Sequence, residues 1–209
     1  KRIMSTYKLF RELETNGNLS YEGLELSYFA NILEANILNS ILKKMIDLIE
    51  WDFDTFKIMG KNITLKRKTA FYGDSSTYYN YSGNKREAKL WTEDLLFLKR
   101  KVESRTKLVF NSVLLNDYTN GEVGMGWHSD DERELGSNPA IASLSLGVSR
   151  DFLFKHKYNK NFNKVKLRLE DGSLLLMHGR SQHFWSHSLP KRLRISERRI
   201  NLTFRNILK

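Results

Sequence analysis

The chain has 209 residues, of which 40% are hydrophobic and 12% aromatic, the composition of one folded globular domain. It contains no cysteine, which excludes disulfide frameworks, thiol catalysis and thiolate-bound metal clusters and is typical of a reducing, intracellular setting. The 35 Lys and Arg outnumber the 24 Asp and Glu, and the net charge of +11 favours an anionic partner such as nucleic acid. No apolar run approaches the roughly 18 residues that cross a bilayer, so we expect no membrane partner.

The N-terminal half predicts two helices. Residues 1–26 are polar with little periodicity, and we interpret them as a loosely held arm. Over Glu34–Glu50 apolar residues recur at three- and four-residue spacing, with Asn31 as the expected N-cap. A second helix is expected from about Thr92 to Ser104. One apolar face on each helix predicts that both pack against a sheet.

The region between and after these helices predicts β-structure. Ile58 to Asn84 is dense in Gly, Tyr and Lys, which indicates short strands and loops. Asp171-Gly172 is typical of a tight hairpin. Neither an internal repeat nor a linker divides residues 27–209, so we predict one α+β domain whose C-terminal half is a β-sandwich or barrel. Apolar residues alternate with polar ones in six segments: Ser112–Tyr118, Ala140–Leu146, Asp151–His156, Val165–Glu170, Ser173–Met177 and Arg199–Asn206.

A metal site is indicated by a histidine and an aspartate two residues apart. On an extended backbone His128 and Asp130 point to the same side, and a closing sheet could bring His187 beside them. Two imidazoles and one carboxylate on one face of an octahedral ion leave the other face open, as in non-haem Fe(II) oxygenases. A lone His-x-Asp also occurs often by chance.

The final strand places its polar residues on one face. Ile200, Leu202 and Phe204 alternate with Arg199, Asn201, Thr203 and Arg205, so two guanidiniums and an amide line the side opposite an apolar one. The planar guanidinium of an arginine can bind a carboxylate through two parallel hydrogen bonds. Asn116 and Tyr118 likewise share a face of their own strand. The alternative is that Arg199 and Arg205 are solvent-facing charges on an outer sheet.

Several segments together carry a resemblance to a known family. Their order and spacing resemble the AlkB family of Fe(II)/2-oxoglutarate-dependent nucleic-acid dealkylases, and are closest to the subgroup with the animal DNA-repair members and their bacterial relatives. The similarity extends from about Ser27 to Ile207. The segments are Asn116-Asp117-Tyr118, His128-Ser129-Asp130-Asp131-Glu132, residues 141–147, His187-Ser188-Leu189-Pro190-Lys191 and Arg199 to Arg205.

The resemblance implies a double-stranded β-helix, or jelly roll, in the C-terminal half, backed by the N-terminal helices. It implies that residues 58–90 form a nucleotide-recognition lid. It also implies Fe(II), 2-oxoglutarate and O2 as cofactor and co-substrates: 2-oxoglutarate becomes succinate and CO2 while an N-methyl group is hydroxylated and lost as formaldehyde. By resemblance His128, Asp130 and His187 are the catalytic iron ligands, and the 2-oxoglutarate set is Asn116, Tyr118, Arg199, Asn201 and Arg205.

Substrate residues are also implied. The target base must be single-stranded or flipped out and held between flat side chains. Tyr79 and Tyr81 match the family's aromatic segment, with Tyr81 the first stacking candidate, although packing between strands is the alternative. By resemblance Glu132, beside Asp131, could read the edge of a cationic methylated base; otherwise the two form a solvated acidic turn. Basic residues flank the site and suit phosphate contacts: Lys61, Lys66, Arg67 and Lys68, and Lys191, Arg192, Arg194 and Arg198.

One departure from the family pattern bears on whether the DNA substrate is single-stranded or duplex. Duplex-acting members insert a hydrophobic finger ahead of the aromatic loop, and the corresponding stretch, Trp51 to Gly60, is short, with Phe53 and Phe56 as its only wedges. We therefore predict a monomeric DNA demethylase that prefers single-stranded methylated DNA, with some activity on RNA or duplex. The expected compartment is the cytoplasm in a bacterium and the nucleus in a eukaryote. The alternatives are a hydroxylase of a protein or small molecule, and a non-catalytic nucleic-acid-binding module.

Overall fold

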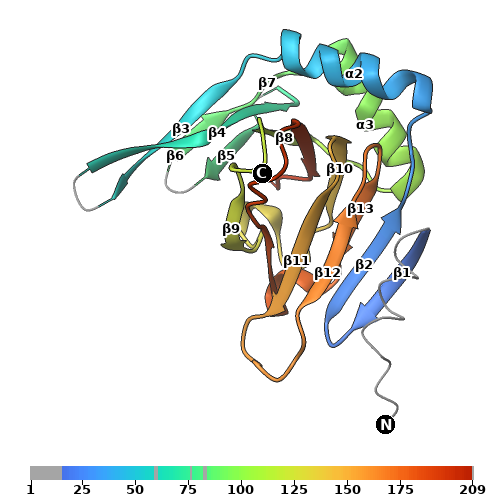
Figure 1. Ribbon diagram of the computed structural model, residues 1–209, viewed down its shortest axis with the longest axis vertical. Coiled ribbons are helices and arrows are strands. Elements are labelled where there is room, and N and C mark those ends of the chain that lie inside the picture. The colour runs from blue at the N-terminus through green and yellow to red at the C-terminus, as the bar shows by residue number, and fades with distance from the viewer. Residues whose placement is uncertain (1–15, 59–60, 76, 82–83, 209) are drawn as a thin grey trace.

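The computed structural model describes residues 16–58, 61–75, 77–81 and 84–208 (Figure 1). Its largest element is an antiparallel sheet, the major sheet, against whose strand β4 a short parallel strand β7 (Lys89–Leu90) also pairs. In spatial order the major sheet contains β1 (Asn16–Tyr21), β2 (Leu24–Phe29), β13 (Leu174–His178), β10 (Ile141–Gly147), β15 (Arg199–Arg205), β8 (Ser112–Tyr118), β4 (Lys61–Gly73) and β3 (Asp52–Ile58).

A second sheet of four strands, the minor sheet, faces the major one. From β8 onward the chain passes repeatedly between the two sheets, which is the double-stranded β-helix that the resemblance implied. All six predicted strands of the C-terminal half are present, within one residue or so at each end. The minor sheet contains β12 (Val165–Leu169), β11 (Arg150–His156), β14 (Trp185–Leu189) and β9 (Met125–His128).

The hairpin predicted at Asp171-Gly172 is wrong. The turn is tight, because Ser173 donates its backbone N–H to Glu170 O at 3.1 Å and Gly172 has φ of +73°. The strands on either side nevertheless belong to different sheets, since β12 pairs with β11 and β13 pairs with β10 and β2. The turn therefore moves the chain from the minor to the major sheet.

Two apolar cores hold the layers together. One lies between the sheets and includes Phe154, Leu167 and Trp185 of the minor sheet. The other lies between the major sheet and the helices α2 (Ala35–Leu48) and α3 (Glu93–Thr106). Ile200, Leu202 and Phe204 of β15 all belong to this second core, so the opposite face of β15 is turned toward the space between the sheets.

Both predicted helices are present and back the major sheet, as expected. α3 begins as predicted, since Thr92 is its N-cap and accepts a hydrogen bond from the Leu95 N–H at 3.3 Å. The N-cap predicted for α2 is wrong, because the cap residue is Glu34, three residues after Asn31, and its side chain makes no capping bond. Among the described helices, none is long and apolar enough to cross a membrane.

Residues 16–26 are not an arm. They fold into the hairpin of β1 and β2, and β2 pairs with β13 in the major sheet. Much of the expected 58–90 lid is also part of this sheet, because β4 pairs with β8 over residues 68–73. Within that range β5 (Tyr78–Tyr81) and β6 (Asn84–Glu87) form a separate two-stranded sheet, and the β3–β4 hairpin projects from the body of the molecule (Figure 1). Residues 1–15 lie outside the described part of the chain.

Candidate metal centre and co-substrate pocket

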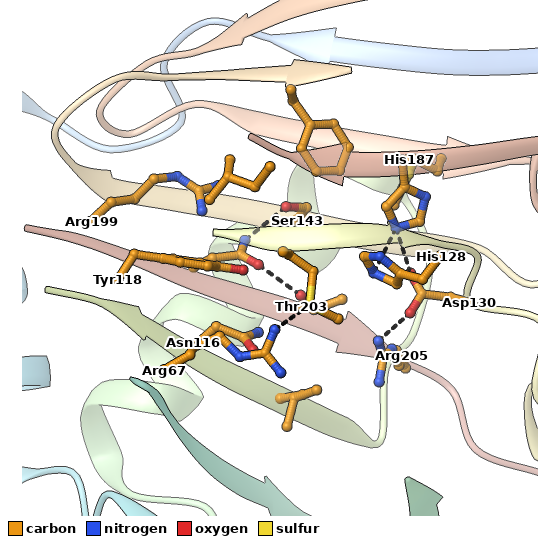
Figure 2. A pocket seen from close by; sticks show the side chains of 16 residues that line it. Arg67, Asn116, Tyr118, His128, Asp130, Ser143, His187, Arg199, Thr203 and Arg205 are labelled. Carbon is orange, nitrogen blue, oxygen red and sulfur yellow. Dashed lines mark hydrogen bonds and ion pairs between the residues drawn. The ribbon is translucent and has the colours of Figure 1, made fainter. Parts of the chain in front are cut away.

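Three side chains converge between the sheets, and they are the three that the sequence singled out. β9 and β14 are neighbours in the minor sheet, and their antiparallel register places His128 directly opposite His187. Asp130 follows two residues after His128, just beyond the end of β9. Nε2 of His187 lies 3.1 Å from Nε2 of His128 and 3.6 Å from Oδ2 of Asp130 (Figure 2).

This cluster fits one divalent ion. One ligand atom from each of the three residues can be chosen so that all lie within 4.8 Å of one another. Two ligands at right angles and about 2.1 Å from one ion would lie about 3 Å apart, which is close to the observed nitrogen separation. Two imidazoles and a carboxylate, without a thiolate, form a donor set that suits Fe(II).

The protonation of the cluster also suits a metal. Nδ1 of His128 lies 2.9 Å from the backbone carbonyl of Gly126, and donation of its proton there leaves Nε2 with a free lone pair. Burial, followed by the neighbouring His128, lowers the pKa of His187 to about 3, so this imidazole is neutral at pH 7. Burial would raise the pKa of Asp130, but the charge and hydrogen bond of Arg205 together with the neighbouring His187 and His128 hold that pKa below its ordinary value.

The polar face of β15 lines the pocket beside this cluster. Arg199, Asn201, Thr203 and Arg205 all face it, and each is at most 7% exposed. This excludes the alternative in which Arg199 and Arg205 are solvent-facing charges. The two arginines differ in their partners, because Arg205 donates to Oδ1 of Asp130, whereas no carboxylate in the described part of the chain pairs with Arg199.

Arg199 is therefore a buried cation without a compensating acid. Its Nη2 donates to Ser145 Oγ at 3.0 Å, its guanidinium lies 5.4 Å from the ring centroid of Tyr118, and its Nε has no hydrogen-bond partner among the residues that the structure describes. Burial lowers its pKa to about 10, which still leaves it charged at neutral pH. A buried charge is costly unless an opposite charge reaches it, so this end of the pocket is built for an anion.

The remaining predicted co-substrate residues lie on the adjacent strand. The register of β8 and β15 places Tyr118 opposite Arg199 and Asn116 opposite Asn201. Figure 2 shows the metal cluster with Arg205 at one end of the pocket and Arg199 with Tyr118 at the other. A small molecule with a carboxylate at each end can span these two ends.

Two serines that hydrogen-bond the pocket residues of β15 were not predicted from the sequence. Ser143 accepts a hydrogen bond from Nδ2 of Asn201 at 2.8 Å, and Ser145 is the partner of Arg199. The signal was present in the segment ASLSL, whose two serines alternate with leucines and share one face of β10. Met125 and Phe152, which also line the pocket, carry no such signal.

The predicted substrate residues are placed unequally. Arg67, expected to contact phosphates, is only 2% exposed, lines the pocket and donates to Sδ of Met125. The ammonium of Lys68 lies 5.4 Å from the ring centroid of Phe53, which is itself half exposed. The side chains of Tyr79 and Tyr81 lie outside the described part of the chain, as does that of Phe56.

The two acidic residues after Asp130 differ. Asp131 forms an ion pair with Lys157 at 2.9 Å, so its charge is already compensated. Glu132 is partly buried, and its Oε2 atom is fully buried without a hydrogen-bond partner among the described residues. Glu132 is therefore the one of the two whose charge is not compensated by an ion pair within the described residues.

The basic residues around the site are partly neutralised. Arg192 pairs with Asp151 at 2.8 Å and Arg198 with Asp117 at 3.3 Å. Lys191 and Arg194 are exposed, and no ion pair within the described chain involves them. These two are the side chains of this segment best placed to meet phosphates.

Comparisons with known proteins agree with this geometry. Residues 25–205 match the model of the 2OG-Fe(II) oxygenase superfamily. The chain is 37% identical over 202 residues to DNA oxidative demethylase ALKBH2 of Bos taurus, covering 93% of this chain and 73% of that protein. It is 42% identical over 149 residues to alpha-ketoglutarate-dependent dioxygenase alkB homolog 3 of Rattus norvegicus, covering 68% of this chain and 50% of that protein. The structure of OsALKBH1 has the same fold, with a TM-score of 0.64 at 16% identity over 91% of this chain and 100% of that one.

Proposed function

This chain belongs to the 2OG-Fe(II) oxygenase superfamily and to its AlkB family, and from this we propose that it is an oxidative demethylase of N-alkylated bases in DNA. Its substrates are of the 1-methyladenine and 3-methylcytosine type. As a member of the superfamily it uses Fe(II), 2-oxoglutarate and O2. The observation that carries the proposal is one pocket with a His-Asp-His cluster at one end and the uncompensated cation of Arg199 at the other.

In this proposal His128, Asp130 and His187 hold the iron, which when bound supplies the oxidation of the methyl group by O2 at the expense of 2-oxoglutarate. Arg205 keeps Asp130 ionised and oriented through their buried ion pair. Arg199 pairs with the carboxylate of 2-oxoglutarate that is distant from the metal, because it is the one of the two β15 arginines that has no acidic partner in the described part of the chain. The phenol of Tyr118 and the amides of Asn116 and Asn201 supply further hydrogen bonds along the pocket.

The proposed roles of the substrate-binding residues rest on the charges around the pocket and on the similarity of the chain to DNA demethylases. Glu132 accepts a donor from the edge of a cationic methylated base, and its unpartnered Oε2 supports this role. Tyr81, with Tyr79, stacks on the flipped base. Arg67 borders the pocket from β4, while Lys68, Lys191 and Arg194 follow the phosphates.

We further propose that the enzyme is a monomer that acts on single-stranded DNA in preference to duplex. In the described part of the β3–β4 hairpin, Phe53 is half exposed and its ring is in contact with the ammonium of Lys68. A half-exposed ring that already contacts a lysine is a weak wedge for opening a base stack. The enzyme acts where DNA is held, in the cytoplasm of a bacterium or the nucleus of a eukaryote.

The test is incubation with Fe(II), 2-oxoglutarate and oligonucleotides that contain 1-methyladenine or 3-methylcytosine, in single-stranded and duplex form. Formaldehyde release and a mass loss of one methylene-equivalent per base are the expected results. Turnover of 2-oxoglutarate without demethylation would instead indicate a hydroxylase of another substrate. Tight DNA binding without any turnover would indicate a non-catalytic module, and an equal rate on duplex would overturn the strand preference.

A further inference from the structure

The side chain of Gln182 joins the two ligand-bearing segments of the pocket. Its Oε1 accepts a hydrogen bond from the backbone N–H of Asp130 at 2.9 Å, across 52 residues of sequence. Gln182 is only 1% exposed and lies on the short helix α4 (Ser181–Phe184), which leads directly into β14 and so to His187. One amide therefore connects the segment carrying Asp130 with the segment carrying His187.

Asp130 needs such a tether because the sheet does not hold it. β9 ends at His128, and residues 129–132 have no regular secondary structure. Two further contacts fix the same segment to α4 and β14. Ser129 Oγ donates to the Trp185 carbonyl at 3.0 Å, and Lys157 Nζ bridges Asp131 and the Gln182 carbonyl at 2.9 and 2.7 Å.

The amide of Gln182 is itself oriented. Its Nε2 faces Sδ of Met177 at 3.6 Å, a weak acceptor, so its oxygen is left for the Asp130 N–H. Without an acceptor this buried N–H would be unsatisfied, and the chain could recover the lost bond only by turning the peptide of Asp130. Such a turn would move the carboxylate away from His187, to which it now lies within 3.6 Å.

We propose that Gln182 is a positioning residue for the metal centre, which it serves by holding the backbone of Asp130 so that the carboxylate faces the two imidazoles. The inference rests on the proposed function, since it assumes that the three residues bind a metal. Contacts that orient a ligand from outside the coordination sphere typically change metal affinity 10- to 100-fold, so the loss of this one should be measurable.

The experiment measures Mn(II) affinity of the metal-free protein by calorimetry, with thermal unfolding of the same samples. Gln182→Met keeps the size of the side chain but replaces the amide oxygen with a thioether, which is only a weak acceptor, and we expect affinity to fall about 10-fold or more. Gln182→Glu keeps an acceptor oxygen and should retain affinity within about threefold. The matched control is Ser181→Ala, which removes two hydrogen bonds of the neighbouring side chain: Ser181 Oγ accepts from the backbone N–H of Glu25 and donates to its carbonyl.

The outcomes separate a positioning role from a structural one. Ser181→Ala and Gln182→Met should both lower the Tm, by roughly 3–8 °C, but only Gln182→Met should weaken Mn(II) binding. Equal affinities in the wild type and Gln182→Met, or equal losses in Gln182→Met and Ser181→Ala, would overturn the inference. Failure of the wild type to bind Mn(II) would instead contradict the proposed metal centre itself.

Discussion

Arg205 donates a hydrogen bond to the carboxylate of Asp130 at the metal end of the pocket, from a position 75 residues further along the chain. The two side chains are 5% and 4% exposed, so neither charge has water to compensate it. Each charge therefore depends on the other, and the ion pair belongs both to the stability of the fold and to the geometry of the metal ligands.

Removing one partner of this pair should be costly even without metal. We expect Arg205→Met to lower the free energy of unfolding of the metal-free protein by about 3–5 kcal/mol, because an uncompensated carboxylate stays buried. The double variant Arg205→Met with Asp130→Asn should recover much of that loss. Urea unfolding of the four proteins in a double-mutant cycle measures the coupling, and additive losses would contradict it.

For Arg199 we expect the opposite result: its removal should not destabilise the fold but should weaken the binding of 2-oxoglutarate. Arg199→Met removes a buried charge that no acid compensates, so the metal-free protein should be as stable as the wild type or more stable. The KM for 2-oxoglutarate should rise about 100-fold, because the far carboxylate loses its cation. Arg168→Met, at an exposed site on β12, is a control for arginine removal and should leave KM unchanged. A normal KM in Arg199→Met would contradict the assigned role.

Asp117 provides a test of pH dependence away from the metal ligands. Burial raises its pKa above the ordinary value, while the charges of Arg198 and Lys68 act in the opposite direction. A carboxyl with a raised folded-state pKa stabilises the fold at low pH and loses that contribution as pH rises through the folded value. Asp117→Asn should therefore be more stable than the wild type at pH 8, and the difference should shrink toward pH 4. Urea unfolding across this range checks the sign. A variant that is less stable at pH 8 would show that the ion pair with Arg198 outweighs burial.

Local sequence patterns predicted the two helices, the strands of the C-terminal half and the polar face of β15 that lines the pocket. The alternation on β15 separated the residues of the helix-side core from those of the pocket, because side chains on a strand alternate whatever the sheet around it. The helices were found for the same reason, since their apolar spacing is a local property. The edge strand β1 was missed because its alternation is carried by only two apolar side chains, Leu19 and Tyr21, of which only Leu19 is buried.

Pairing between distant segments could not be read in the same way. A period of two shows that residues 165–169 and 174–178 are strands, but it does not show that they join different sheets. Gln182 was missed for a related reason, because its significance lies in a contact with Asp130 that exists only after both sheets have formed. The strand pattern alone offered the convergence of His128 and His187 only as a possibility of a closing sheet, the family resemblance implied it, and the register of β9 with β14 produces it.

The adjacent acidic residues Asp131 and Glu132 give a matched pair for testing substrate recognition. Asp131 is paired with Lys157, whereas Oε2 of Glu132 is buried without a partner among the described residues. A cationic base would supply the missing charge, so Glu132→Gln should lower kcat/KM for 3-methylcytosine about 10- to 100-fold. Decarboxylation of 2-oxoglutarate without DNA should change little, because Glu132 does not line the pocket between Arg199 and the metal cluster. Asp131→Asn is the control and should stay within about threefold of the wild type, since an exposed ion pair contributes little. Equal losses of demethylation in the two variants would show that the acidic turn acts through its overall charge, not through a contact made by Glu132.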